Sequence, residues 1–292
     1  MTTGLEHDFE LLRSFDGTPI ATRLLGGGAG LPVLVVNAIG ANLAAWRRAL
    51  VDLVEERPVL TWDHRGLHAS GPPATDRLDA GAHAEDAVAA LDRHGFERCA
   101  VVAWSSGTRI GLELVSRYPE RVAGMVLVCG SYGHSLGRLL RLELGSFLPL
   151  VASVAKYFSW FVEGPLAAVA SRPELAGLIR QSGFVGATAD GAALADIFRG
   201  MAACDMRMLL ESYEKVAGDP APHLLDSISC AVLAVAGNKD IVTPPALMEA
   251  TVERIPGARL TVYEGATHYL PIEFPARLSE DIRKFLSDLP AG

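Results

Sequence analysis

The chain lacks the features that mark several large classes of protein. Basic side chains are outnumbered, 26 Lys and Arg against 34 Asp and Glu, so a basic surface for nucleic acid is not expected. The four cysteines lie far apart, without a CxxC pair or a Cys/His spacing typical of zinc sites. Buried free thiols are therefore favoured over disulfides, and neither a metal nor an organic cofactor is predicted.

Long uninterrupted apolar runs are also missing. The most apolar segment, residues 144–162, is broken by glycine, proline, serine and lysine, whereas a membrane-spanning helix needs about 20 residues with few such breaks. The first residues show no basic stretch followed by an apolar one, as a secretory signal has. We therefore predict no transmembrane segment and a cytoplasmic location.

Half of the 292 residues are hydrophobic, and they follow a regular pattern along the chain. Short Val-rich segments alternate with helical ones over the first 130 residues, which is typical of a mostly parallel sheet covered by helices on both faces. The expected strands are residues 9–14, 20–25, 33–36, 59–62, 100–102 and 125–128, and the expected helices are 43–54, 79–94 and 108–117.

This alternation stops after residue 130 and returns near residue 231. Residues 131–226 contain no convincing Val-rich strand and fit several helices. Strands at 231–236 and 260–263 and helices at 245–254 and 275–286 follow. We predict an α/β core built from residues 1–130 and 227–292, with residues 131–226 inserted as a helical lid; the alternative is a separate helical domain.

One segment of the core has the pattern of a nucleophile elbow. Residues 103–107 read Ala-Trp-Ser-Ser-Gly between an expected strand and an expected helix. Such a turn presents the Ser105 hydroxyl clear of the backbone, and it requires small residues at positions 103 and 107. The backbone N–H of Ser106, at the start of a helix, would point to where negative charge builds on a bound carbonyl.

Two further loops follow strands at the same expected edge of the sheet. Asp240 follows residues 231–236, and His268 follows residues 260–263. Ser105, Asp240 and His268 therefore occur in the order nucleophile, acid, base, with His268 able to accept the serine proton and Asp240 able to orient the imidazole. Taken separately, Asp240 also fits a turn aspartate and His268 a surface histidine.

The second oxyanion donor is expected in the loop after residues 33–36. The backbone N–H of Ile39 is the candidate, paired with that of Ser106. The alternative, which is compatible with it, is an ordinary strand-to-helix turn with Asn42 as the helix cap.

Together these segments resemble the α/β-hydrolase superfamily, in its lidded esterase, lipase and lactonase branch. Besides the elbow, the resemblance includes Asp-His-Arg-Gly-Leu-His-Ala-Ser at residues 63–70, Tyr-Pro-Glu-Arg-Val at 118–122 and Gly-Ala-Thr-His at 265–268. It departs in three places. Asn37 and Ala38 replace a common His-Gly, Ala103 replaces a glycine, and His68 replaces another glycine, where we favour a structural role over a catalytic one.

The predicted lid is far more apolar than a solvated helix requires. Some of its side chains, with Phe158 and Trp160 as candidates, would form an apolar substrate pocket together with Trp104. The same surplus also fits contact with a second copy of the chain, giving a homodimer, or with a membrane surface.

The resemblance implies a serine hydrolase without cofactor that cleaves a carboxylic ester, thioester or lactone with an apolar moiety through an acyl-enzyme. Three alternatives use the same fold. They are a carbon-carbon bond hydrolase or natural-product tailoring enzyme, a cofactor-free perhydrolase with haloperoxidase activity, and a slow or non-catalytic small-molecule binding protein.

Overall fold

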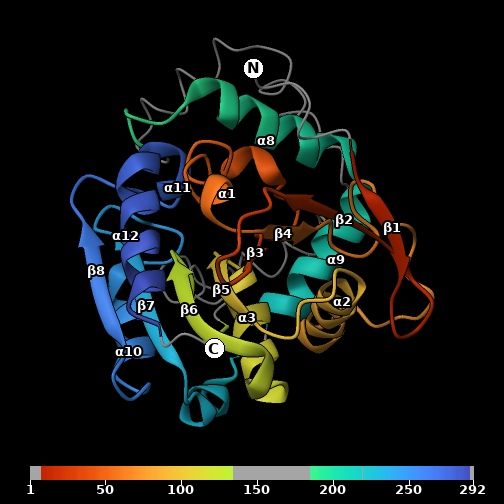
Figure 1. Ribbon diagram of the computed structural model, residues 1–292. Helices are drawn as coiled ribbons and strands as arrows, with labels where there is room; N and C mark the ends of the chain where they lie inside the picture. Colours follow the sequence, from red (N-terminus) through yellow and green to blue (C-terminus); the bar gives the residue numbers. More distant parts are fainter. Residues whose placement is uncertain (1–7, 134–184, 219, 290–292) are drawn as a thin grey trace.

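The computed structural model describes residues 8–133, 185–218 and 220–289, which form an α/β structure around one twisted sheet (Figure 1). The sheet has eight strands in the order β1-β2-β4-β3-β5-β6-β7-β8. β1, β2 and β4 pair antiparallel, and the remaining pairs are parallel. The strands are β1 Glu10–Arg13, β2 Pro19–Leu25, β3 Val33–Val36, β4 Val59–Trp62, β5 Cys99–Trp104, β6 Val122–Val128, β7 Ala231–Gly237 and β8 Arg259–Tyr263.

The central strands are buried on both faces. Every residue of β3, β4, β5 and β6 is buried, which agrees with their nearly continuous Val, Leu and Ala composition. Strand positions predicted from the sequence are confirmed, although β5 and β6 begin earlier than expected. The parallel strands direct their carboxyl ends to one edge of the sheet, where ligand-binding loops gather in this class of fold.

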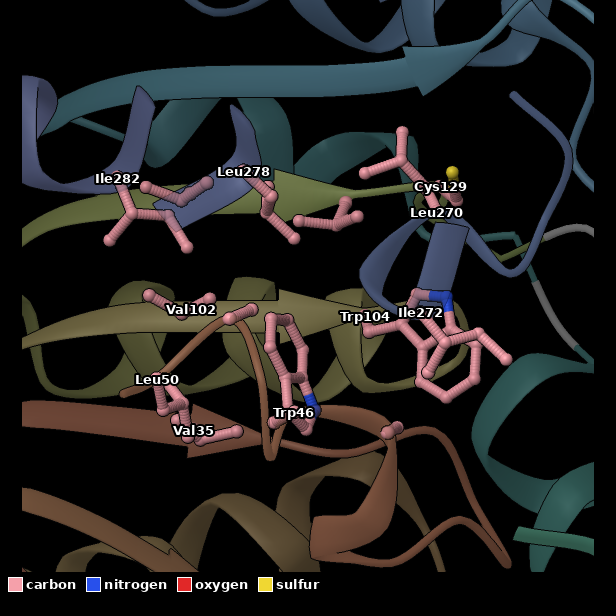
Figure 2. Packing of buried hydrophobic residues seen from close by; sticks show 14 of the residues in the cluster. Val35, Trp46, Leu50, Val102, Trp104, Cys129, Leu270, Ile272, Leu278 and Ile282 are labelled. Atoms are coloured by element: carbon pink, nitrogen blue, oxygen red, sulfur yellow. The ribbon is translucent and has the colours of Figure 1, made fainter. Parts of the chain in front are cut away.

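Helices cover the two faces of the sheet and create two apolar clusters. Leu34, Val101 and Met125 pack toward α2 (Ala80–Arg93), α3 (Gly107–Arg117) and α10 (Pro245–Val252). Their neighbours Val35, Val102 and Val126 pack toward α1 (Leu53–Glu56) and α12 (Pro275–Ser287) in the other cluster, which Figure 2 shows. The helices are α1 Leu53–Glu56, α2 Ala80–Arg93, α3 Gly107–Arg117, α8 Gly191–Ala203, α9 Met206–Ala217, α10 Pro245–Val252, α11 Leu270–Glu273 and α12 Pro275–Ser287, with 3₁₀ turns η1 Leu43–Ala45, η2 Pro119–Arg121 and η4 Pro222–Ser227.

The continuous helix predicted for residues 43–54 is wrong. The segment instead forms η1, a run of turns and the short helix α1. The physical reason is a tertiary contact of Trp46, whose fully buried indole donates its N–H to Asn37 Oδ1 at 2.8 Å. This contact holds the chain against the loop after β3, which outweighs local helix propensity.

Part of the predicted lid lies outside the described residues, namely 134–184. From residue 185 on, the described part is helical, with α8, α9 and η4. α8 lies across one end of the core near α1 and α11 (Figure 1), and the carbonyl oxygen of Asp196 accepts from Asn42 Nδ2 at 3.4 Å. The division into two core segments and a complete lid stays a prediction.

Two further expectations concern membranes and thiols. No helix in the three described stretches combines the length and apolar character that a membrane crossing requires. All four cysteines are free, as predicted. Cys99 and Cys129 are buried, and burial raises the pKa of the Cys99 thiol to about 12; Cys204 and Cys230 are partly exposed.

Candidate active site

Ser105 occupies a strained turn between β5 and α3. Its φ of +56° lies in the left-handed region that non-glycine residues avoid. Its backbone N–H donates to the carbonyl oxygen of Val128 at 2.9 Å, which fixes the turn to β6. A Cβ at Gly107 would lie 2.5 Å from the carbonyl oxygens of Val36 and Asn37, so only glycine fits there. The steric demand expected of a nucleophile elbow is therefore present.

The three side chains predicted to act together form one hydrogen-bonded chain. His268 Nε2 lies 2.8 Å from Ser105 Oγ, and His268 Nδ1 lies 2.9 Å from Asp240 Oδ2. They come from the loops after β5, β7 and β8, which meet at the carboxyl edge of the sheet. Since Asp240 is only 3% exposed and His268 7% exposed, water competes little for these contacts.

Asp240 is held as a carboxylate by several donors. Its Oδ1 accepts the backbone N–H groups of Val242 and Thr243, both at 2.8 Å, and its Oδ2 accepts the Thr243 hydroxyl at 2.8 Å. Burial by itself raises the pKa of Asp240, but the charge and hydrogen bond of His268 and the donors of Thr243 outweigh it and hold the pKa below its usual value.

Thr243 was not singled out in the sequence. Its hydroxyl oxygen also lies 3.2 Å from His268 Nδ1, so it contacts both members of the acid-base pair. Its position three residues after Asp240 indicates such a contact, because this is the spacing of a side chain that closes an aspartate turn.

The loop that carries His268 is secured from two sides. The indole N–H of Trp104 donates to the carbonyl oxygen of His268 at 3.0 Å. The buried carboxylate of Glu273 accepts the backbone N–H groups of Thr267 and Gly186, both at 2.7 Å. Glu273 thus ties the histidine loop to the segment that leads into α8. No sequence pattern predicts the bond to Gly186, because that residue lies 87 positions away.

The predicted oxyanion residues are adjacent in space. Ile39 lies in the loop after β3 and Ser106 at the start of α3, and the Ile39 N–H donates to Ser106 Oγ at 2.9 Å. Asn42 caps η1, as the alternative interpretation of this loop expected, by accepting the N–H of Ala44 at 3.0 Å. Both interpretations of the loop are therefore compatible with the structure.

Asn37 anchors this loop through hydrogen bonds of its side chain. Its Nδ2 donates to Thr61 Oγ1 at 3.3 Å, and its Oδ1 accepts the Trp46 indole N–H. Thr61 Oγ1 in turn donates to the carbonyl oxygen of Val35 at 3.0 Å. The side chain of Asn37 thus links β3, β4 and the start of the turn segment.

Residues 63–70 form a scaffold held by ion pairs and hydrogen bonds, in line with the structural role expected for His68. Asp63 pairs with Arg23 at 2.8 Å, and the buried Arg65 pairs with Asp86 at 2.6 Å. His68, with φ of +52°, donates from Nε2 to the carbonyl oxygen of Gly40 at 3.1 Å. This bond connects the scaffold to the loop that carries Ile39.

Of the three predicted pocket residues, the structure describes Trp104. Trp104 is buried, 3% exposed, with its ring centroid 5.9 Å from that of His268, and Figure 2 shows it in the core cluster beside Ile272. Phe158 and Trp160 lie outside the described residues. The pocket therefore stays a prediction. Across the described ranges, no group of three or more His, Cys, Asp or Glu side chains is suited to hold a metal ion.

Comparison with known proteins places this geometry in a family. A pimeloyl-[acyl-carrier protein] methyl ester esterase of Neisseria meningitidis is 27% identical over 279 residues, 89% of this chain and 79% of the relative. A 2-hydroxymuconate semialdehyde hydrolase of Pseudomonas is 33% identical over 129 residues, 43% of this chain and 45% of the relative. The crystal structure of an enol-lactonase from Burkholderia xenovorans superposes with a TM-score of 0.78 at 20% identity, covering 96% of this chain and all of the other.

The family model for the alpha/beta hydrolase fold matches residues 32–275, which include the elbow and both loops that carry Asp240 and His268. Because this match spans most of the chain and the sheet has the order described above, the chain belongs to the α/β-hydrolase family.

Proposed function

We propose that the protein is a serine hydrolase that cleaves a carboxylic ester, thioester or lactone, with Ser105 as nucleophile, His268 as general base and Asp240 as the group that orients His268. The observation that carries the proposal is the chain Ser105–His268–Asp240, with contacts of 2.8 and 2.9 Å. A serine hydroxyl is a weak nucleophile until an adjacent imidazole accepts its proton, and this contact supplies that imidazole.

The reaction follows from these positions. Ser105 Oγ attacks the carbonyl carbon while its proton passes to His268 Nε2, and the carbonyl oxygen becomes an oxyanion near the N–H groups of Ser106 and Ile39. The imidazolium, stabilised by Asp240, then donates its proton to the leaving group. Water attacks the resulting acyl-enzyme with His268 again as base, which releases the acid and restores Ser105.

The substrate class is supported by the relatives. The Neisseria esterase, which aligns with 89% of this chain, acts on a methyl ester. We infer that the present chain also takes an ester with an apolar acyl part, and that the predicted lid residues Phe158 and Trp160 supply apolar contacts. Binding to nucleic acids is not expected, because the net charge of the chain is −8.

A carbon-carbon bond hydrolase is the second candidate. It is favoured by the 33% identity to the 2-hydroxymuconate semialdehyde hydrolase, but that similarity spans only 43% of the chain. The ester hydrolase is preferred because its relative aligns over about twice that length.

A substrate panel separates the two candidates. The panel contains p-nitrophenyl esters from acetate to octanoate, an acyl thioester, a lactone and 2-hydroxymuconate semialdehyde, each with the wild-type protein and Ser105→Ala. We expect kcat/KM to rise with acyl length, by up to ~0.8 kcal/mol per methylene newly buried, and Ser105→Ala to lose at least ~10³-fold in kcat. Exclusive turnover of the semialdehyde would favour the second candidate, and no turnover of any compound would contradict both.

A further inference from the structure

The side chain of Ser106 does not make the bond that its position favours. Ser106 is the N-cap residue of α3, where a serine oxygen usually accepts a backbone N–H two or three residues further on. That bond is missing here. The Ser106 hydroxyl oxygen accepts the Ile39 N–H instead, at 2.9 Å and in a buried setting. The hydroxyl therefore lies between the two loops that are expected to bind the oxyanion.

The proton of this hydroxyl is available for another acceptor. A hydroxyl has one proton to donate and two lone pairs to accept with, and Ile39 uses one of the lone pairs. Among the residues that the structure describes, none accepts the Ser106 proton. Ser106 is only 8% exposed, so bulk water has little access to it. A donor kept unused in a nearly buried position points to a partner that arrives with the substrate.

Position and chemistry together identify that partner. Ser106 follows the nucleophile directly, and its hydroxyl meets the Ile39 N–H, so the hydroxyl lies beside Ser105 where the oxyanion is expected. During attack, the group that gains acceptor strength at this place is the carbonyl oxygen of the substrate, because it takes on negative charge.

We propose that the Ser106 hydroxyl is a catalytic residue that donates directly to the oxyanion beside the backbone N–H of Ser106; this proposal rests on the ester hydrolysis proposed above. Ile39 donates to Ser106 Oγ, and Ser106 donates its O–H to the oxyanion. The proton stays on Ser106; only the proton of Ser105 is transferred, to His268. A hydroxyl that accepts an N–H bond is polarised and becomes a stronger donor, so the Ile39 N–H acts on the oxyanion through Ser106.

An occluding role for the same hydroxyl would have the opposite effect. If Ser106 Oγ only filled the oxyanion site, the substrate would have to displace it, and removing the hydroxyl would raise the rate. A donor to the oxyanion acts mainly in the transition state, so its removal lowers kcat with little change in KM.

The test uses the full chain with p-nitrophenyl butyrate and compares wild type, Ser106→Ala and Ser106→Thr. Ser116→Ala is the matched control, since Ser116 lies on the same helix and hydrogen-bonds to Ser227 at the other end. We expect Ser106→Ala to lose at least about tenfold in kcat with KM within about twofold, Ser106→Thr to recover most of it, and the control to match wild type. The Ki of an aryl trifluoromethyl ketone, which forms an oxyanion adduct on a serine, should rise by a similar factor in Ser106→Ala.

A kcat for Ser106→Ala equal to or above wild type would overturn the inference. If the alanine variant does not fold, Ser106→Cys serves instead, because a thiol is a weak donor; unchanged kcat in that variant overturns the inference, and a loss supports it. Failure of the proposed function looks different. Wild type would then lack esterase activity, or Ser105→Ala would retain it, and both proposals would fall.

Discussion

The proposed acid-base half of the site and the proposed oxyanion half are held in different ways. In the acid-base half, the donors that fix Asp240 come from Val242 and Thr243, two and three residues along the chain, and from His268. In the oxyanion half, Asn37 depends on Thr61 and Trp46, and the Ile39 N–H depends on Ser106, 67 residues away.

A short stretch of sequence is therefore enough to hold the Asp240 carboxylate, whereas the oxyanion loop is held only once distant segments have folded together. An aspartate turn is stabilised by residues close together in the chain, so the Asp240 carboxylate is fixed largely by its own loop. The oxyanion loop needs side chains delivered by β4, by the turn after η1 and by the start of α3.

Loss of the acid-base half should have the largest effect. We expect His268→Ala to lower kcat at least ~10³-fold, and Asp240→Asn to leave a small residual rate because the asparagine favours the wrong tautomer of the imidazole. Steady-state kinetics on p-nitrophenyl butyrate measures both. Nearly full activity in Asp240→Asn would show that Asp240, which its own loop holds in place, is not the functional acid.

Loss of the oxyanion anchor should have an intermediate effect. Asn37→Leu removes the acceptor for the Trp46 indole and the donor to Thr61, so the loop with Ile39 is expected to shift and kcat to fall by about 10 to 100-fold. The buried, unpaired indole N–H should also lower the free energy of unfolding by about 1–3 kcal/mol. The control is Asn42→Ser in the same loop, which keeps a capping oxygen. Equal kinetics for the two variants would show that Asn37 does not position the oxyanion donors.

A smaller effect is expected for Thr243, which is one donor among several. Thr243→Val removes the hydroxyl bond to Asp240 Oδ2 and keeps the backbone bonds to Oδ1. Because that hydroxyl bond helps to lower the pKa of Asp240, the pKa should rise toward its usual value. A loss of about 1 kcal/mol corresponds to roughly a fivefold lower kcat. Thr243→Ser should restore it; a serine variant as slow as valine would argue for a packing role of the threonine methyl.

The smallest effect on kcat is expected from a third region, the buried pair His64 and His83. Their rings meet edge to face at 4.9 Å. Burial, followed by the charge of Arg65, lowers the pKa of His83 to about 3, and burial and nearby His83 lower that of His64. The unfolded chain therefore binds more protons below about pH 6.5, so the free energy of unfolding falls as the pH drops from about 6.5 toward 3.

His83→Leu tests that region directly. Removing one such histidine should flatten this dependence by about 1.4 kcal/mol per pH unit within the window and leave kcat at neutral pH unchanged. Urea unfolding at several pH values, beside kinetics, measures both quantities. An unchanged slope, or a large loss of kcat, would mean that this pair is not the purely structural cluster described here.

The two halves also differ in how far the sequence predicts them. The strands with Val-rich, doubly buried segments were located correctly, and so were the loops that bring Ser105, Asp240 and His268 within hydrogen-bond distance, because strand ends in a parallel sheet share an edge. The helix expected at residues 43–54 was wrong because a tertiary bond from Trp46 to Asn37 overrides local propensity. The sequence predicts that Ile39 and Ser106 lie close together, but not that the Ser106 side chain accepts the Ile39 N–H. The bond from Gly186 to Glu273 is also not predicted, because the two residues are 87 positions apart and a lone polar residue gives no periodic signal.

Covalent labelling tests whether Ser105 is the nucleophile. An alkyl fluorophosphonate reacts with an activated serine, and peptide mapping by mass spectrometry locates the adduct. We expect one adduct per chain, on the peptide that contains Ser105, with none in Ser105→Ala and strongly slowed labelling in His268→Ala. An adduct on a different residue, or labelling of Ser105→Ala at the wild-type rate, would contradict the assignment of Ser105 as nucleophile.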